Sequence, residues 1–275
     1  MVAGHRAREP PDPIPNSEVK PRSVPGFSAV FGRAKPGKPA TTYNHASLLT
    51  YKIKSLALAL RKMERGDLEG LLLAIKKLKN TKIRDLVKTR IEEFKENGEK
   101  PSREIFKELC FCILTANFNA ERCIKIFEEL NDEFLSLSER ELAEKLRILG
   151  HRYPRTRAKY IVEARRYAGS LKNVIENFKD ENKLREWLVK NVRGVGYKEA
   201  SHFLRNIGFI NLAIIDYHII NILARHKLIE KPKTITRNRY FEIENLLRKI
   251  AEKLGLTLAE LDLYLWYLET GKVLK

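Results

Sequence analysis

Apolar residues recur at helical spacing through most of the chain. The first regular set is Leu71, Leu72, Ile75 and Leu78, and the next is Ile83, Leu86, Val87, Ile91 and Phe94. Steps of three and four residues place each set on one face of a helix. We expect the second helix to end at Asn97-Gly98, and Pro101-Ser102 to open a strongly apolar helix through Leu114 that belongs to the core.

Two capping boxes begin further helices, one formed by Ser138 with Glu141 and the other by Thr257 with Glu260. In each, a hydroxyl and a carboxylate satisfy backbone amides that the helix leaves unpaired. More helices are expected at about 155–168, 182–192, 197–207, 216–227 and 239–253. No alternating strand pattern with hairpin turns competes with them. The sequence therefore predicts an all-α fold, a compact array of about ten helices.

The N-terminal part of the chain has a different composition. Eight of the eleven prolines lie in the first 39 residues, so we expect residues 1–45 to be a disordered extension. Residues 46–62 are either a short helix or a linker, and the working domain is expected at 63–275. The N-terminal segment lacks the apolar stretch of a secretory signal, and no run of about 18 apolar residues predicts a membrane span.

The charge and the cysteines narrow the class of protein. The chain carries 53 Lys and Arg against 35 Asp and Glu, a formal net charge of +18. This surplus favours a polyanionic partner, because binding releases counterions from phosphates, although a generically basic surface is the alternative. Cys110, Cys112 and Cys123 lie among apolar residues and indicate core packing in a reducing, intracellular setting.

The stretch VRGVGYKEA at 192–200 joins two predicted helices by a very short connection. Gly194 and Gly196 suit positive backbone torsions or close backbone approach, so the stretch predicts a helix-hairpin-helix. Exposed amides at the start of its second helix could hold a DNA phosphate. Hairpin carbonyls, here those of Lys190, Val192 and Val195, could hold a monovalent cation. A plain connection between helices is the alternative.

Lys198 lies in the first turn of that second helix, where the helix dipole disfavours positive charge. An amine that must be neutral to act as a nucleophile benefits from this position. Asp216, 18 residues later in LAIIDYHII, can face the lysine across a cleft and accept its proton or stabilise a cationic sugar. The alternatives are a lysine that contacts phosphate and an aspartate that caps the next helix.

The run Val192 to Ala200, followed at this spacing by Ile215-Asp216-Tyr217-His218, resembles the helix-hairpin-helix-GPD superfamily of DNA base-excision glycosylases. The resemblance covers about 63–275. It matches Lys198 to the lysine of bifunctional members and Asp216 to the superfamily's aspartate, which implies glycosylase and AP lyase activity. Within the superfamily the chain resembles the archaeal second class of 8-oxoguanine DNA glycosylase. It lacks the C-terminal cysteine cluster of the endonuclease III branch and the N-terminal sheet domain of the eukaryotic enzymes.

The resemblance also implies roles for residues that the pattern alone would assign to core or surface. The residues expected to contact DNA are Asn117, Tyr153, Arg155 and Arg157 from the resemblance, Gly194 and Gly196 from the hairpin, and His218, for which a structural histidine is the alternative. Asn117 would fill the gap left by a flipped base, and Tyr153 or Arg155 would wedge the duplex. Trp266 and Lys275 would recognise the base, since a terminal carboxylate on Lys275 could accept the N7 hydrogen that distinguishes 8-oxoguanine from guanine.

The implied reaction extrudes the damaged nucleotide, forms an imine between Lys198 and the sugar, and cleaves the strand by β-elimination. It requires no cofactor and no metal. The expected partner is double-stranded DNA with an oxidised base, bound by a monomer in the cytoplasm of a prokaryote, with an archaeon expected. The alternatives are a related glycosylase for oxidised pyrimidines or mismatches, and a non-enzymatic helix-hairpin-helix module.

Overall fold

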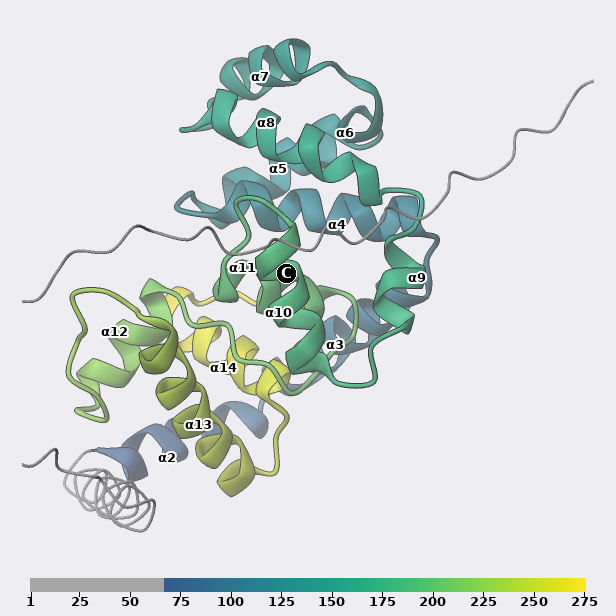
Figure 1. The fold of residues 1–275 in the computed structure, drawn as a ribbon. Coiled ribbons are helices and arrows are strands. Elements are labelled where there is room, and N and C mark those ends of the chain that lie inside the picture. The colour runs from purple at the N-terminus through teal and green to yellow at the C-terminus, as the bar shows by residue number, and fades with distance from the viewer. Residues whose placement is uncertain (1–66) are drawn as a thin grey trace, which may run out of the picture. The chain divides into compact units, whose positions relative to one another are not determined.

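The computed structural model describes residues 67–275, so the predictions for residues 1–66 lie outside the described residues. This part of the chain is all helical, with thirteen α-helices, one 3-10 turn and no strand (Figure 1). The elements are α2 (Leu68–Lys79), α3 (Ile83–Glu99), α4 (Ser102–Thr115), α5 (Ala120–Leu130), α6 (Glu133–Ser136), α7 (Glu139–Ile148), α8 (Pro154–Ala164), η1 (Arg165–Tyr167), α9 (Leu171–Glu176), α10 (Glu181–Asn191), α11 (Tyr197–Asn206), α12 (Tyr217–Arg225), α13 (Arg237–Leu254) and α14 (Leu258–Thr270).

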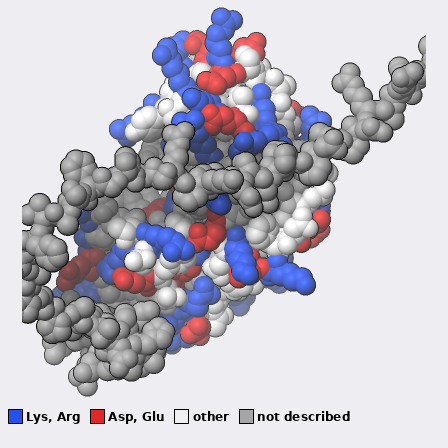
Figure 2. Space-filling view, viewed as in Figure 1, with Lys and Arg blue, Asp and Glu red and all other residues white. Residues whose placement is uncertain are grey.

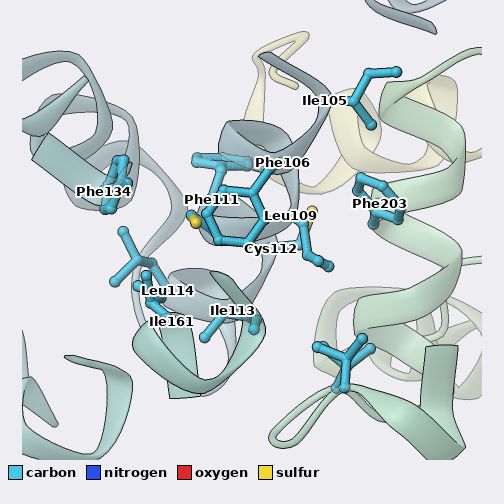
Figure 3. Close-up of a cluster of buried hydrophobic side chains, with 14 of the residues drawn as sticks. Ile105, Phe106, Leu109, Phe111, Cys112, Ile113, Leu114, Phe134, Ile161 and Phe203 are labelled. Atoms are coloured by element: carbon cyan, nitrogen blue, oxygen red, sulfur yellow. The ribbon is translucent and has the colours of Figure 1, made fainter. Parts of the chain in front are cut away.

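One apolar cluster surrounds α4, as the sequence predicted. Every side chain of α4 from Ile105 to Thr115 is buried, and α5, α8, α10 and α11 contribute further members of the cluster (Figure 3). A helix that carries apolar residues on most of its surface must be covered on most sides to remove that surface from water. The central position of α4 follows from this composition.

A second apolar cluster joins the two ends of the described chain. Leu71 and Ile75 of α2 and Phe94 of α3 pack with side chains of α12, α13 and α14. The last helix, α14, contacts α2, α3, α12 and α13, and α11 contacts both α3 and α4. Helix α11 therefore lies where the two clusters meet, and it carries the residues that follow the glycine hairpin.

The helix count and one helix end differ from the prediction. The sequence pattern did not indicate α5, α6 or α9, because α6 and α9 are too short to repeat an apolar face and α5 buries only Cys123, Ile126 and Leu130. Gly98 does not end α3, which continues to Glu99. A Cβ on Gly98 would lie 2.3 Å from the Ile207 carbonyl oxygen, so this glycine permits a close approach of two backbones.

The predicted caps and the core cysteines are confirmed. Ser138 and Thr257 accept hydrogen bonds from the amides of Glu141 and Glu260, and each glutamate accepts one in return. Cys110, Cys112 and Cys123 are free thiols with no exposed surface. Burial raises the pKa of all three thiols, which disfavours the reactive thiolate form.

Candidate functional site

A cavity of about 840 Å³ is lined by residues that are distant in sequence. It is bordered by the loop between α4 and α5, by α11, by the segment Ile214 to His218, by α14 and by Lys275. The structure thus brings together six of the predicted site residues, namely Asn117, Lys198, Asp216, His218, Trp266 and Lys275.

The glycine hairpin between α10 and α11 has the predicted form. Gly194 has a φ of +81°, and a Cβ there would lie 2.1 Å from the Tyr160 ring, so both backbone torsion and space require glycine. Gly196 is extended, with a φ of −95°, and its role is to precede α11 as the N-cap. The Gly196 amide donates to Glu199 at 3.1 Å, whereas the amides of Tyr197 and Lys198 have no acceptor among the described residues. These two amides are available to an anion.

The carbonyl groups suggested for a cation show one internal contact. The Val195 amide donates to the Val192 carbonyl at 3.2 Å, which closes the turn. Cation binding at Lys190, Val192 and Val195 stays a prediction.

Lys198 and Asp216 face the same cavity from two different helix starts. The Lys198 side chain is half-buried and makes no hydrogen bond or ion pair with any described residue. Asp216 is the N-cap of α12, and its Oδ1 accepts from the Ile219 amide at 3.0 Å. This bond fixes the direction of the carboxylate, so the capping role and a chemical role are compatible in one residue.

Trp266 and His218 form an aromatic wall of the cavity. Their ring centroids are 4.6 Å apart in an edge-to-face arrangement. The indole Nε1 and the His218 Nδ1 are both buried without a hydrogen-bond partner among the described residues. Buried polar atoms normally have partners, so these two ring nitrogens are exceptions at this wall.

Lys275 is anchored by its side chain. Its Nζ lies 2.9 Å from Glu108 Oε1 and is 3.8 Å and 4.5 Å from the ring centroids of Phe127 and Phe111. An ammonium held between two aromatic faces and paired with a carboxylate keeps the residue in place. The backbone of Lys275 raises the pKa of the His202 ring, against a larger lowering by burial.

A buried chain of polar contacts connects α14 to Lys275. Arg205 of α11 forms an ion pair with Asp262 and donates to Asn206 Oδ1 at 2.9 Å. Asn206 in turn donates to Glu108, the partner of Lys275, at 3.3 Å. Burial raises the pKa of Asp262 to about 6, with Arg205 opposing the shift and Asp216 adding to it. The charge of Asp262 is therefore coupled to the charges of Arg205 and Asp216, which both border the cavity.

Sequence reasoning missed three of these cavity residues, His202, Arg205 and Asp262. His202 and Arg205 follow Lys198 by four and seven residues on α11, and Asp262 precedes Trp266 by four on α14. Residues at these spacings share one face of a helix. That periodicity, counted from Lys198 and Trp266, was the available signal.

Residues His151, after α7, and Arg157, in α8, hold the loop that carries Asn117. Asn117 is exposed and has a positive φ of 57°. The His151 ring bonds to the Leu114 carbonyl at 3.0 Å, and Arg157 donates to the Ala116 carbonyl at 2.5 Å. Arg157 is therefore a buried support for this loop, and its guanidinium is not presented at the surface as a DNA contact would require.

Tyr153 is the exposed aromatic residue of the second predicted loop. It precedes Pro154 at the start of α8, and Arg152 and Arg157 lie over its ring at 5.1 Å and 5.8 Å. Arg155 lines a separate hollow against α7, whereas Arg152 borders the main cavity. The structure thus places Arg152, and not Arg155, in the lining of the cavity, and Tyr153 lies against Arg152.

The charged groups on the surface are of both signs. Figure 2 shows Lys and Arg side chains over the part that contains α7 and α8, with acidic side chains between them. Within residues 67–275, no helix combines the length and apolar character that crossing a lipid bilayer requires.

His202 gives a testable pH dependence of stability. Burial, followed by the nearby cations Arg205, Lys198 and Lys275, holds the pKa of this ring well below its ordinary value of 6.5. The unfolded chain then binds a proton below pH 6.5 that the native protein does not, so stability is lost as pH falls through this region. Chemical denaturation of His202→Gln should show a weaker pH dependence between pH 6.5 and 5.5, by up to about 1.4 kcal/mol per pH unit. Equal slopes in the two proteins would contradict the buried neutral state of His202.

Comparisons with known proteins identify the family of this chain. The profile of the 8-oxoguanine DNA glycosylase family matches residues 87–256. The 8-oxoguanine DNA glycosylases/AP lyases of Korarchaeum cryptofilum and Methanocaldococcus jannaschii are each 55% identical over 202 residues, 73% of this chain and 96% and 97% of theirs.

Two solved structures share the fold. The crystal structure of the Methanocaldococcus jannaschii 8-oxoguanine glycosylase/lyase with a 15mer DNA containing 8-oxoguanine has a TM-score of 0.73 and 55% identity, covering 74% of this chain and 99% of that one. The 8-oxoguanine DNA glycosylase of Thermotoga maritima has a TM-score of 0.72 and 47% identity, covering 76% and 100%. This chain belongs to the helix-hairpin-helix family of 8-oxoguanine DNA glycosylases.

Proposed function

We propose that this protein excises 8-oxoguanine from duplex DNA and then cleaves the strand by β-elimination. The observation that carries the proposal is the unpaired amine of Lys198, which shares a cavity with the Asp216 carboxylate directly after a helix-hairpin-helix. The same cavity has an aromatic wall of His218 and Trp266, which suits a flipped base. The relatives named above for this activity are similar over nearly their whole length.

In this proposal Lys198 is the nucleophile and Asp216 the stabilising carboxylate. The neutral Lys198 amine attacks C1′ while the bond from C1′ to the base nitrogen breaks, and the base leaves with the bonding electrons and takes up a proton. Asp216 stabilises the positive charge that develops on the sugar and accepts a proton from the amine. The sugar ring opens to an imine, a proton leaves C2′, and the bond from C3′ to its oxygen breaks.

We assign base recognition to Trp266 and Lys275. Trp266 offers a flat apolar face for stacking, and a main-chain oxygen of Lys275 is a hydrogen-bond acceptor for the N7 hydrogen that guanine lacks. The Lys275 side chain is buried between Phe111 and Phe127, which keeps that oxygen next to the cavity. Asn117 and Tyr153 are assigned to the gap and the wedge, since both are exposed and Asn117 lines the cavity. His218 and the hairpin amides are assigned to phosphates.

Residues 63–275 are proposed to form the working domain, acting as a monomer on chromosomal DNA in the cytoplasm. The N-terminal residues are not needed for any step of this mechanism.

Lys275→Ala tests the assignment of the base pocket. Loss of the ammonium removes its contacts with Glu108 and both phenyl rings, so the main-chain oxygen is no longer held in place. We expect 8-oxoguanine excision to slow by about tenfold, while cleavage of a preformed abasic site stays unchanged. Single-turnover gel assays on the two duplexes measure both rates. Lys253→Ala, an exposed lysine of α13, is the control, and an equal loss on both substrates would argue against a role in base recognition.

Borohydride trapping tests the proposed function directly. The full chain is incubated with duplexes that contain 8-oxoguanine, thymine glycol or an abasic site, and borohydride reduces any imine to a stable covalent adduct. We expect adducts with 8-oxoguanine and with the abasic site, and a much weaker one with thymine glycol. Preferential trapping on thymine glycol would shift the activity to oxidised pyrimidines. Absence of any adduct would reject the lyase mechanism.

A further inference from the structure

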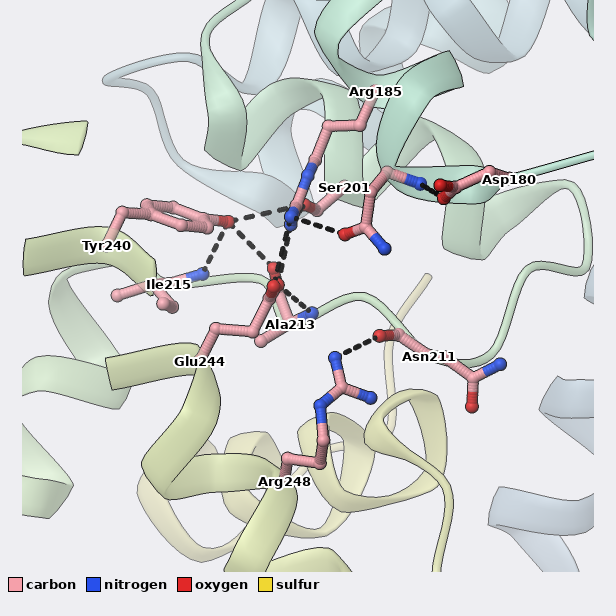
Figure 4. A network of polar contacts seen from close by, with 10 residues as sticks. Asp180, Arg185, Ser201, Asn211, Ala213, Ile215, Tyr240, Glu244 and Arg248 are labelled. Carbon is pink, nitrogen blue, oxygen red and sulfur yellow. Dashed lines mark hydrogen bonds and ion pairs between the residues drawn. The ribbon is translucent and has the colours of Figure 1, made fainter. Parts of the chain in front are cut away.

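A buried polar cluster lies behind the cavity and belongs neither to its lining nor to the predicted site. Its members are Arg185 of α10, Ser201 of α11, and Tyr240 and Glu244 of α13, which we call the buried quartet (Figure 4). Arg185 and Ser201 have no exposed surface, and Tyr240 and Glu244 are 4% and 3% exposed. A cluster this dry must satisfy all its charges internally.

Arg185 and Glu244 form the ionic part of the buried quartet. The guanidinium donates two hydrogen bonds to the carboxylate, at 2.6 Å to Oε2 and 3.0 Å to Oε1. The same Nη1 also donates to the Ser201 hydroxyl at 3.2 Å. The pair therefore fastens α11, the helix of Lys198, to α10 and α13.

Tyr240 and Glu244 also hold the extended segment that ends at Asp216. The Tyr240 hydroxyl donates to the Ala213 carbonyl at 2.7 Å and accepts from the Ile215 amide at 3.4 Å. Glu244 Oε2 accepts from the Ala213 amide at 2.9 Å. The segment is extended and has no neighbouring strand, so these side chains provide the partners that its buried backbone groups need.

The two arms of the candidate site thus meet at one cluster. Ser201 lies three residues after Lys198 on α11, and its hydroxyl is 3.3 Å from that of Tyr240. Ile215 directly precedes Asp216. A displacement of Tyr240 or Glu244 would therefore move the lysine helix and the aspartate segment relative to each other, although neither side chain lines the cavity.

We propose that Tyr240 and Glu244 are positioning residues that set the separation between Lys198 and Asp216. The inference rests on the proposed function, because the separation matters only if the two groups act in one reaction. A misplacement of about 1 Å can slow catalysis by about 100-fold when a reaction depends on alignment. The quartet thus acts on the rate of the chemical step and not on the affinity for DNA, which is bound by loops on the surface.

Tyr240→Phe is the variant that tests the positioning role. It removes one hydroxyl and keeps the ring. The Ala213 carbonyl and the Ile215 amide then lose their partner, and no large cavity forms. Tyr264→Phe is the matched control, because Tyr264 is buried in the same apolar cluster and its hydroxyl bonds to no described residue. Ser201→Ala removes only the contacts toward α11 and leaves the bond to Ala213 intact.

The measurements are the single-turnover excision rate at saturating enzyme and the Kd for a duplex with a non-cleavable abasic analogue, both well below the unfolding temperature of each variant. We expect Tyr240→Phe to excise 8-oxoguanine about 10- to 100-fold more slowly, with a Kd within about twofold of the wild type. Ser201→Ala should show a smaller loss of rate, and Tyr264→Phe should match the wild type. A merely structural role would lower the unfolding temperature without this separation of rate from affinity.

Two results would overturn the positioning role. One is a Tyr240→Phe rate within about threefold of Tyr264→Phe, and the other is a parallel loss of rate and affinity, which would mean that the domain has loosened as a whole. A wild-type protein that excises no base is a different outcome, because it rejects the proposed function and the positioning role together.

Discussion

Replacing Lys198 with glutamine is expected to abolish strand cleavage and borohydride trapping, with a loss of at least about 10³-fold. Glutamine keeps a polar side chain of similar length at the start of α11 but cannot form an imine. Because Lys198 bonds to no described residue, its removal leaves no buried charge unpaired, and we expect the fold to be unchanged. Trapping on abasic-site DNA measures the chemistry, and thermal unfolding measures the fold.

The affinity for DNA distinguishes this enzyme prediction from the prediction for a DNA-binding module without activity. Lys198→Gln should retain its affinity for a lesion duplex within a few-fold, since the hairpin and the exposed loops hold the DNA. Lys183→Gln, an exposed lysine on α10, is the matched control and should retain full cleavage. A Lys198→Gln protein that still forms an adduct would show that another amine is the nucleophile.

Asp216→Asn is expected to slow base excision by about 10²- to 10⁴-fold while leaving stability nearly unchanged. Asparagine is as good an N-cap as aspartate, so its side-chain oxygen can still accept from the Ile219 amide and keep α12 intact. Only the negative charge is lost. This substitution therefore distinguishes the chemical role of Asp216 from its capping role.

Asp216→Ala completes that comparison. It removes the cap as well as the charge, so we expect an additional loss of about 1 kcal/mol in the free energy of unfolding, measured by chemical denaturation. Single-turnover excision of 8-oxoguanine measures the rate for both variants. If Asp216→Asn excised the base at the wild-type rate, Asp216 would be a helix cap alone and the proposed mechanism would need another carboxylate.

The elements that begin or end at glycines and helix-capping residues were predictable from the sequence. Gly194 requires a positive φ, and Asp216 ends an apolar run before a helix, so the two helix starts that carry the candidate pair could be placed by local rules. The burial of α4 followed from its apolar composition, and the two capping boxes followed from their spacing. These features depend on a few neighbouring residues, and tertiary packing did not alter them.

The walls of the cavity were not predictable in this way. Asp262 meets Arg205 across a separation of 57 residues, and Lys275 reaches Glu108 over a separation of 167 residues. The burial of Arg157 was hidden for the same reason, because the Ala116 carbonyl that it supports belongs to a loop 41 residues away. From sequence alone, a basic residue near the start of a helix is expected to be exposed, and only the packing of the fold shows that Arg157 is buried.

The support beneath the Asn117 loop bears on which partner deforms during lesion search. Because His151 and Arg157 bond to the Leu114 and Ala116 carbonyls, contacts within the protein itself restrain this loop. The mechanical work of an encounter then falls mainly on the duplex, which must bend and unstack to fit a preformed surface. A weakened base pair costs less free energy to unstack than an intact one. A stiff protein surface therefore favours lesion sites over undamaged DNA through the local deformability of the duplex.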